Sequence, residues 1–118
     1  MQDDLSAGDF LVFQLESGFG LLRLLAVDSG DERVWHVAGY RDFFPDVDSA
    51  EAAAHSPSDL TLELSHAALT ERAFGSTEVA RLINIRLSDA EIEPLDRWRS
   101  TPDHTIYDRS VRLLMGFR

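Results

Sequence analysis

The sequence predicts an α+β fold, built on a small antiparallel sheet of about five strands with two or three helices. The sheet is expected to form either a partly open SH3-like barrel or a curved sheet. Short apolar runs separated by tight turns open the chain, and a helix-capping pattern follows them. No repeat or linker interrupts residues 1–118, so one domain is expected.

The first two strands are expected to form a hairpin. Residues 10–15 are apolar except for Gln14, which is typical of a strand buried on both faces or wrapped into a small barrel. Residues 16–20 then form a short loop in which either glycine can adopt a positive φ. Residues 21–27 return as the second strand. Arg23 interrupts this strand, so one of its faces is expected to reach solvent there.

A third strand over residues 33–40 would complete an antiparallel meander, because this segment is rich in β-branched and aromatic residues. Gly39 stands where a bulge or bend would be useful. Residues 41–47 contain Pro45, which favours an irregular crossing. This crossing is expected to place Phe43 or Phe44 beneath the sheet.

The middle of the chain predicts a helix, a strand and a second helix. Residues 49–55 are rich in alanine, and a short helix there would end at Ser56 and Pro57. Residues 60–65 alternate apolar and polar side chains, which indicates a half-buried strand. A weaker helical pattern covers residues 66–74 and stops at Gly75.

The last third predicts a fifth strand and a capped helix. Alternation over residues 80–87 indicates the strand. Ser88 and Glu91 have the spacing of a capping box, and apolar side chains then share one helical face, so a helix is predicted over residues 89–99. The end of the chain is compatible with a helical stripe or with a strand over residues 110–117.

The composition excludes several classes of protein. With 44% hydrophobic and 27% charged residues, the chain has the balance of a globular protein. It contains no cysteine, which excludes disulfides and thiolate sites, and no lysine, which excludes Schiff-base chemistry. No apolar run approaches the ~20 residues of a membrane span, and the N-terminus lacks a signal-peptide pattern. A cytoplasmic location without a membrane is expected.

The net charge of −10, from 21 acidic residues against 11 arginines, indicates which classes of macromolecule the chain can bind. Such a field repels phosphate backbones, so nucleic-acid binding is disfavoured and a basic protein partner is favoured. The alternative is that the acidity serves only solubility. One acidic run contains no arginine and comprises Asp42, Asp46, Asp48, Glu51, Asp59 and Glu63.

Aromatic side chains beside this run complete a candidate binding surface. Tyrosine and other aromatic residues often anchor interfaces, and carboxylates around them suit a cationic protein surface. Trp35 and Trp98 are instead expected in the core. The predicted partner-binding residues are Tyr40, Asp42, Phe43, Asp46, Asp48 and Glu51.

The sequence offers no catalytic, metal or cofactor signature. His104 and Asp108 are four residues apart, whereas a metal site normally needs three or four convergent ligands. His36, in a strand with valines on either side, is interpreted as a hydrogen-bonded residue at a sheet edge rather than as a base. No serine stands in a nucleophile elbow, and no glycine loop is arranged to hold phosphate. No catalytic residue, metal or cofactor is therefore predicted.

Residues 8–27, GDFLVFQLESGFGLLRLLAV, resemble the N-terminal hairpin of bacterial immunity protein 26-type domains. The shared features are a Gly-Asp start, an apolar strand, a glycine turn and a second strand. The resemblance covers about the first third of the chain and implies a role in neutralising a toxin. The Gly-Asp opening is also similar to that of PemK-like toxins and other SH3-like barrels, which would imply RNA cleavage, but the negative charge disfavours that activity.

The leading interpretation is a non-catalytic acidic binding protein, an immunity protein that occludes the surface of a basic, nuclease-type toxin. A second interpretation is a small-ligand-binding protein or hydrolytic enzyme with its site in a cleft beside the sheet. A third is a homodimeric structural or assembly subunit joined through an exposed strand edge. Monomer and homodimer are both left open.

Overall fold

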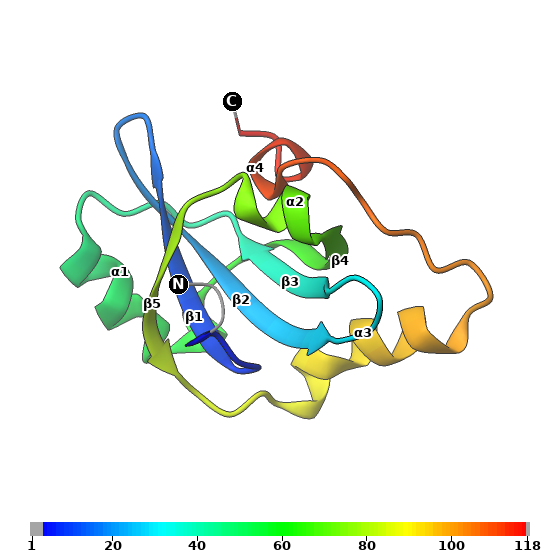
Figure 1. Ribbon diagram of the computed structural model, residues 1–118. Coiled ribbons are helices and arrows are strands. Elements are labelled where there is room, and N and C mark those ends of the chain that lie inside the picture. The colour runs from blue at the N-terminus through cyan, green and yellow to red at the C-terminus, as the bar shows by residue number, and fades with distance from the viewer. Residues whose placement is uncertain (1–3, 118) are drawn as a thin grey trace.

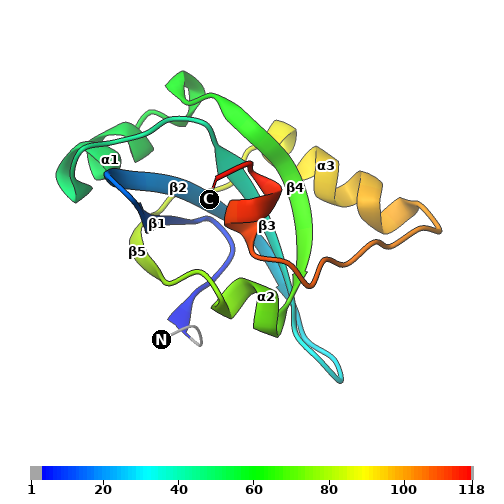
Figure 2. The same ribbon diagram turned by 90° about the horizontal axis from the view of Figure 1, so that it is seen from above.

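The computed structural model of the chain describes residues 4–117. It contains an open five-stranded antiparallel sheet in the order β4-β3-β2-β1-β5, with helices on both faces (Figures 1 and 2). The predicted α+β class is confirmed, and the sheet is not closed into a barrel. The strands are β1 (Asp9–Leu15), β2 (Gly18–Asp28), β3 (Val34–Tyr40), β4 (Leu62–Thr70) and β5 (Val79–Asn84).

The helices are short except for one, and the structure has more of them than the two or three predicted. A 3-10 turn, η2 (Pro57–Asp59), follows the first helix. The α-helices are α1 (Val47–Ala54), α2 (Glu71–Gly75), α3 (Asp89–Ser100) and α4 (Val111–Leu114). Within residues 4–117, none is long and apolar enough to cross a membrane.

The hairpin turn between β1 and β2 is tighter than predicted. Leu15 pairs with Gly18, so only residues 16–17 connect the strands. Gly18 and Gly20 lie within β2 and neither has a positive φ. A Cβ atom at Gly18 would lie 2.5 Å from the carbonyl oxygen of Phe44. Gly18 is therefore needed for close packing against the crossing segment, not for turn conformation.

The helix predicted over residues 66–74 is wrong, because β4 continues to Thr70 and α2 begins only at Glu71. Ala67 and Leu69 are buried and pair with Val37 and Trp35 of β3. Pairing with a buried central strand outweighs a weak local preference for helix. The predicted bulge at Gly39 is confirmed, since the register shifts on both sides of it.

Each face of the sheet has its own core, which explains why β1 is almost wholly apolar. Leu11 and Phe13 belong to the face that packs against α2 and α4. Phe10 and Val12 belong to the opposite face, which α1 covers and where Leu95 of α3 also packs. A strand with a core on both sides has no face left for polar residues.

The two tryptophans lie in different environments. Trp35 is buried and stacks on Phe74 with ring centroids 4.2 Å apart, which confirms its place in the core. Its indole N–H donates to the Glu71 carboxylate at 2.6 Å. Trp98, also expected in the core, is only half-buried, and its ring contacts those of His36 in β3 and of His104.

The predicted start of α3 is confirmed in detail. The Ser88 hydroxyl accepts the backbone N–H of Glu91, and the Glu91 carboxylate accepts the backbone N–H of Ser88. Of the two alternatives for residues 110–117, the structure has a helix, α4. The crossing segment places Phe44 against the sheet through backbone hydrogen bonds to Phe19.

Candidate functional site

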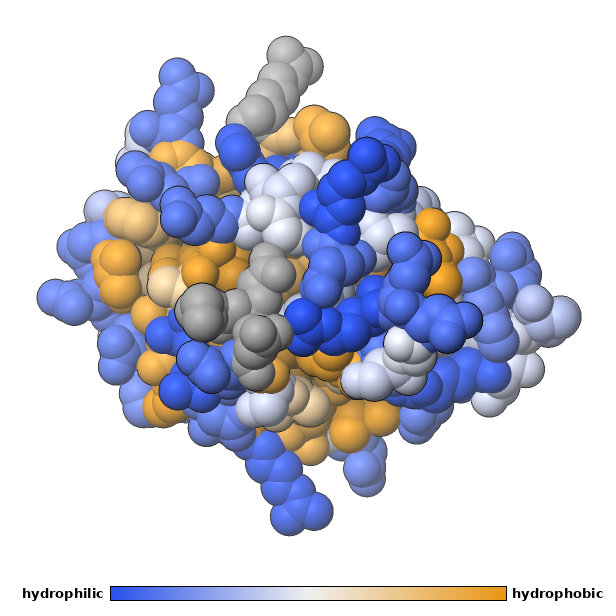
Figure 3. All heavy atoms as spheres, in the orientation of Figure 1, coloured by the Kyte–Doolittle hydropathy of each residue, from blue (hydrophilic) through white to orange (hydrophobic). Residues whose placement is uncertain are grey.

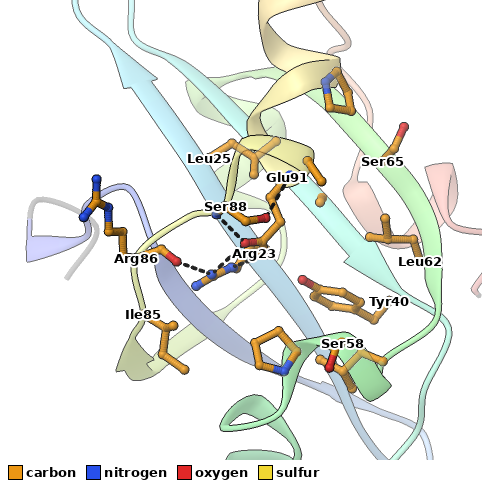
Figure 4. A pocket seen from close by; sticks show the side chains of 15 residues that line it. Arg23, Leu25, Tyr40, Ser58, Leu62, Ser65, Ile85, Arg86, Ser88 and Glu91 are labelled. Atoms are coloured by element: carbon orange, nitrogen blue, oxygen red, sulfur yellow. Dashed lines mark hydrogen bonds and ion pairs between the residues drawn. The ribbon is translucent and has the colours of Figure 1, made fainter.

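A pocket of about 510 Å³ opens on the face of the sheet that carries α1 and α3 (Figure 4). Its floor consists of side chains from β2 and β3, and its walls come from η2, β4, the segment that leads into α3 and the first turns of α3 itself. Most of the lining side chains are apolar. Three polar residues meet at its centre, Arg23, Tyr40 and Glu91, and the other polar residues of the lining are Ser58, Ser65, Arg86 and Ser88.

Arg23 lies in the floor of this pocket, and its expected solvent exposure is wrong because it is fully buried. Its Nε donates to the Glu91 carboxylate at 3.0 Å, and its two NH groups reach the carbonyl oxygens of Gly8 and Arg86. The guanidinium carbon lies 4.2 Å from the centroid of the Phe10 ring. A buried cation is stable only when paired and hydrogen-bonded in this way.

The Gly-Asp motif at the start of β1 positions one of these carbonyl groups. Gly8 has a φ of 95°, and a Cβ atom there would lie 2.9 Å from the carbonyl oxygen of Ile85. The Asp9 carboxylate accepts hydrogen bonds from the Ser6 backbone and the Asn84 side chain, both at 2.8 Å. This loop therefore holds the Gly8 carbonyl against the buried guanidinium.

Glu91 joins the start of α3 to the pocket floor. Burial alone would raise its pKa, but hydrogen bonds from Arg23 and from the Ser88 backbone lower it, and the net pKa lies below the ordinary value. Glu91 is therefore ionised at neutral pH. The pair with Arg23 leaves the floor of the pocket electrically neutral.

Tyr40, predicted to anchor a partner, lies in this floor and not on the outer surface. It is 3% exposed, and its ring stacks on Phe10 with centroids 5.9 Å apart. Its hydroxyl points toward Arg23 and Glu91 at the centre of the pocket (Figure 4). Burial raises the pKa of Tyr40 to about 12, so the phenol keeps its proton.

The other predicted partner-binding residues lie in and around α1. Asp42 accepts the Thr61 backbone N–H at 2.6 Å, and Asp46 caps α1 by accepting the Ser49 backbone N–H at 2.7 Å. These hydrogen bonds from Ser49 lower the pKa of Asp46. Asp48 and Glu51 are exposed on α1, and Phe43 is 46% exposed. The structure thus gathers the predicted carboxylates at one end of the molecule but separates Tyr40 from them by burial.

Arginine pairs with six carboxylates among residues 4–117, including one member of the predicted acidic run. Glu63 pairs with Arg41 and is therefore neutralised. Within residues 4–117, no arginine pairs with the remaining members of the run, which we call the acidic segment: Asp42, Asp46, Asp48, Glu51 and Asp59. The other arginine–carboxylate pairs among the described residues are Arg23–Glu91, Arg33–Glu71, Arg72–Asp108, Arg97–Glu93 and Arg99–Asp28.

A histidine pair lies on the other side of α3. His36 is fully buried in β3, which has a neighbour on both sides, so the expected edge position is wrong. Its Nε2 lies 2.9 Å from the Asp28 carboxylate, and its Nδ1 lies 3.0 Å from Nε2 of His66. Arg99 binds the same Asp28 carboxylate through both NH groups.

The groups around His36 and His66 determine which of their ring nitrogens carry a proton. Burial lowers the pKa of His36 and, with the positive charges of His36 and Arg99, lowers that of His66 to about 4. Both rings are therefore neutral at pH 7. Because Asp28 accepts from Nε2 of His36, its Nδ1 must accept from His66, which leaves Nδ1 of His66 without a proton.

Arg23 and Glu91 were not predicted as pocket residues. A charged side chain inside an otherwise apolar strand was the available signal, because such a residue is either exposed or buried with a partner. The partner could not be identified, since 68 residues separate the two in the chain. Within residues 4–117, no group of three or more histidine or carboxylate side chains is arranged to hold a metal ion.

Comparison of the chain with known protein families, with curated proteins and with solved structures finds no match.

Proposed function

We propose that this chain is a non-catalytic binding protein that docks on a basic protein partner through the acidic segment, as an immunity protein docks on a basic, nuclease-type toxin. The observation that carries the proposal is the acidic segment itself. Its five carboxylates have no arginine partner within residues 4–117 and no arginine lies between them in the chain, whereas other carboxylates without an arginine partner, such as Asp31 and Glu32, occur in smaller groups. Such carboxylates are free to attract and orient a cationic surface.

Exposed apolar side chains accompany these charges. Phe43 is 46% exposed and Val47 is 37% exposed, and both lie within the same stretch as the carboxylates. On the face drawn in Figure 3, hydrophobic residues gather mainly in the half that carries α1 and β5, between hydrophilic ones. An apolar anchor ringed by charge is typical of protein interfaces. The resemblance of residues 8–27 to immunity protein 26-type domains points the same way.

The acidic segment divides into carboxylates with and without a structural role. Asp42 and Asp46 hold backbone N–H groups, so changing them would also perturb local structure. Asp48 and Glu51 are exposed on α1 and are better targets. Asp31 and Glu32, in the turn between β2 and β3 at the far end of the sheet (Figures 1 and 2), provide a matched control with the same loss of charge.

The test starts by capturing partners from a lysate of the source organism and purifying the one retained. Its affinity for the wild-type chain, D48N/E51Q and D31N/E32Q is then measured by calorimetry. We expect D48N/E51Q to weaken binding by about 10-fold or more, D31N/E32Q to change it little, and binding to fall as salt screens the charges. Equal effects of the two double variants, or binding insensitive to salt, would overturn the proposal.

A further inference from the structure

We propose that the pocket beside α3 binds a neutral, mainly apolar small molecule that carries a hydrogen-bond acceptor. This inference is independent of the acidic segment. The pocket volume of about 510 Å³ lies in the range of roughly 300–1,000 Å³ that small-molecule sites occupy. Such sites combine apolar walls with a few polar groups that fix the orientation of the ligand.

The charges in the floor determine the charge of the ligand. Arg23 directs its NH groups to the Glu91 carboxylate and to backbone carbonyl oxygens. Glu91 in turn accepts from Arg23 and from the Ser88 backbone. The Arg86 guanidinium points away from the pocket centre (Figure 4). An anion would therefore have to compete with Glu91 for the buried Arg23 guanidinium, and a cation would have to compete with that guanidinium for Glu91, at a high cost in either case. A neutral ligand would not have to compete with either member of this ion pair.

The free polar group of the floor is the Tyr40 hydroxyl. Tyr40 is buried, and its hydroxyl points into the pocket (Figure 4). Arg23, which is only a donor, approaches the phenol oxygen. No hydrogen bond among residues 4–117 takes the hydroxyl proton, so this proton is free to bind a carbonyl, ether or hydroxyl oxygen of a ligand.

The walls supply the apolar contacts. Leu25 of β2 and Ala38 of β3 belong to the floor. Ile85 and Leu62 lie on opposite sides of the opening (Figure 4). Leu62 belongs to a strand predicted to be half-buried, yet it is 50% exposed because nothing in residues 4–117 covers this wall. A bound apolar group would cover it.

The test uses a matched set of probes with the full chain. The probes are 2-acetylnaphthalene, 2-ethylnaphthalene, 2-naphthoate and 2-aminomethylnaphthalene, and binding is followed by NMR chemical-shift titration of the backbone amides. We expect 2-acetylnaphthalene to shift the amides of Ala38 and Tyr40 and to bind at least about 10-fold more tightly than the other three, about 1.4 kcal/mol. Equal or tighter binding of a charged probe, or no shift with any probe, would overturn the proposal.

Variants separate the pocket from other apolar surface. Tyr40→Phe should remove the preference for 2-acetylnaphthalene over 2-ethylnaphthalene, since only the ketone needs a donor. Leu62→Ser should weaken both probes. Leu113→Ser is the matched control, because Leu113 is 53% exposed on α4, which packs on the other face of the sheet. A preference that survives Tyr40→Phe, or equal losses in the two leucine variants, would contradict the assignment.

Discussion

Replacing Glu91 with glutamine tests the ion pair on which the pocket floor depends. Glutamine has the same length and can still accept the Ser88 N–H in the capping box, so the substitution mainly removes charge. The Arg23 side chain is 1% exposed and would be left with the carbonyl oxygens of Gly8 and Arg86 and the ring of Phe10. A buried cation would then lack its counter-charge.

The size of the loss follows from what remains around Arg23. Breaking a buried ion pair on one side costs about 3–5 kcal/mol. Two carbonyl acceptors and an aromatic ring stay in place, and the Glu91 side chain is 23% exposed, so we expect a loss at or just below the lower limit of this range, about 2–3 kcal/mol. Adding Arg23→Met to Glu91→Gln removes both charges and should recover about 1 kcal/mol or more.

Urea denaturation followed by tryptophan fluorescence measures these free energies of unfolding. Glu93→Gln is the matched control on the same helix, because Glu93 pairs with an arginine at the exposed surface and should matter much less. The reasoning is refuted if Glu91→Gln costs less than about 1 kcal/mol, or if the double variant is less stable than Glu91→Gln alone.

Three further outcomes are expected in the same assay. Ser88→Ala should cost about 1 kcal/mol through loss of the cap of α3, and no loss would contradict the capping box. Gly18→Ala should destabilise the hairpin, because its Cβ would meet the Phe44 carbonyl oxygen, and an unchanged urea midpoint would contradict this packing. Acidification from pH 7 to pH 4 should lower the free energy of unfolding by about 1–2 kcal/mol through His66, whose pKa is about 4 against the ordinary 6.5. This is roughly half of what the full difference in pKa would give, because His66 is only half-buried and solvent screens its interactions. The unfolded chain takes up that proton first, so stability falls as the pH falls, and His66→Gln should lose less than the wild type over the same range.

The parts of the fold that the sequence predicted are those that neighbouring residues determine. Ser88 and Glu91 cap α3 through contacts that span three residues. The meander of β1, β2 and β3 follows from short apolar runs and tight turns, and Gly39 marked the bulge where β3 pairs with β4. Local patterns of this kind leave little room for tertiary structure to change the outcome.

The parts that could not be predicted depend on distant contacts. His66 to Leu69 form a strand because β3 lies beside them, and no pattern within these residues records that neighbour. Arg23 is buried because Glu91 reaches it from α3. For the same reason the acidic segment was visible in the sequence, whereas the pocket, assembled from four separate stretches of chain, was not.

The two edge strands of the open sheet differ in whether another backbone segment hydrogen-bonds to their outer side. The backbone of Tyr107 occupies part of the outer side of β4 by donating to Ala68 at 2.8 Å and accepting from Thr70 at 3.0 Å. No segment of residues 4–117 does the same for β5, whose Arg81 is exposed. A strand with one unpaired edge can template the growth of aggregates, and a charged side chain on it opposes that growth. Replacing Arg81 with an uncharged residue would therefore favour ordered self-assembly of copies of the chain through the outer edge of β5.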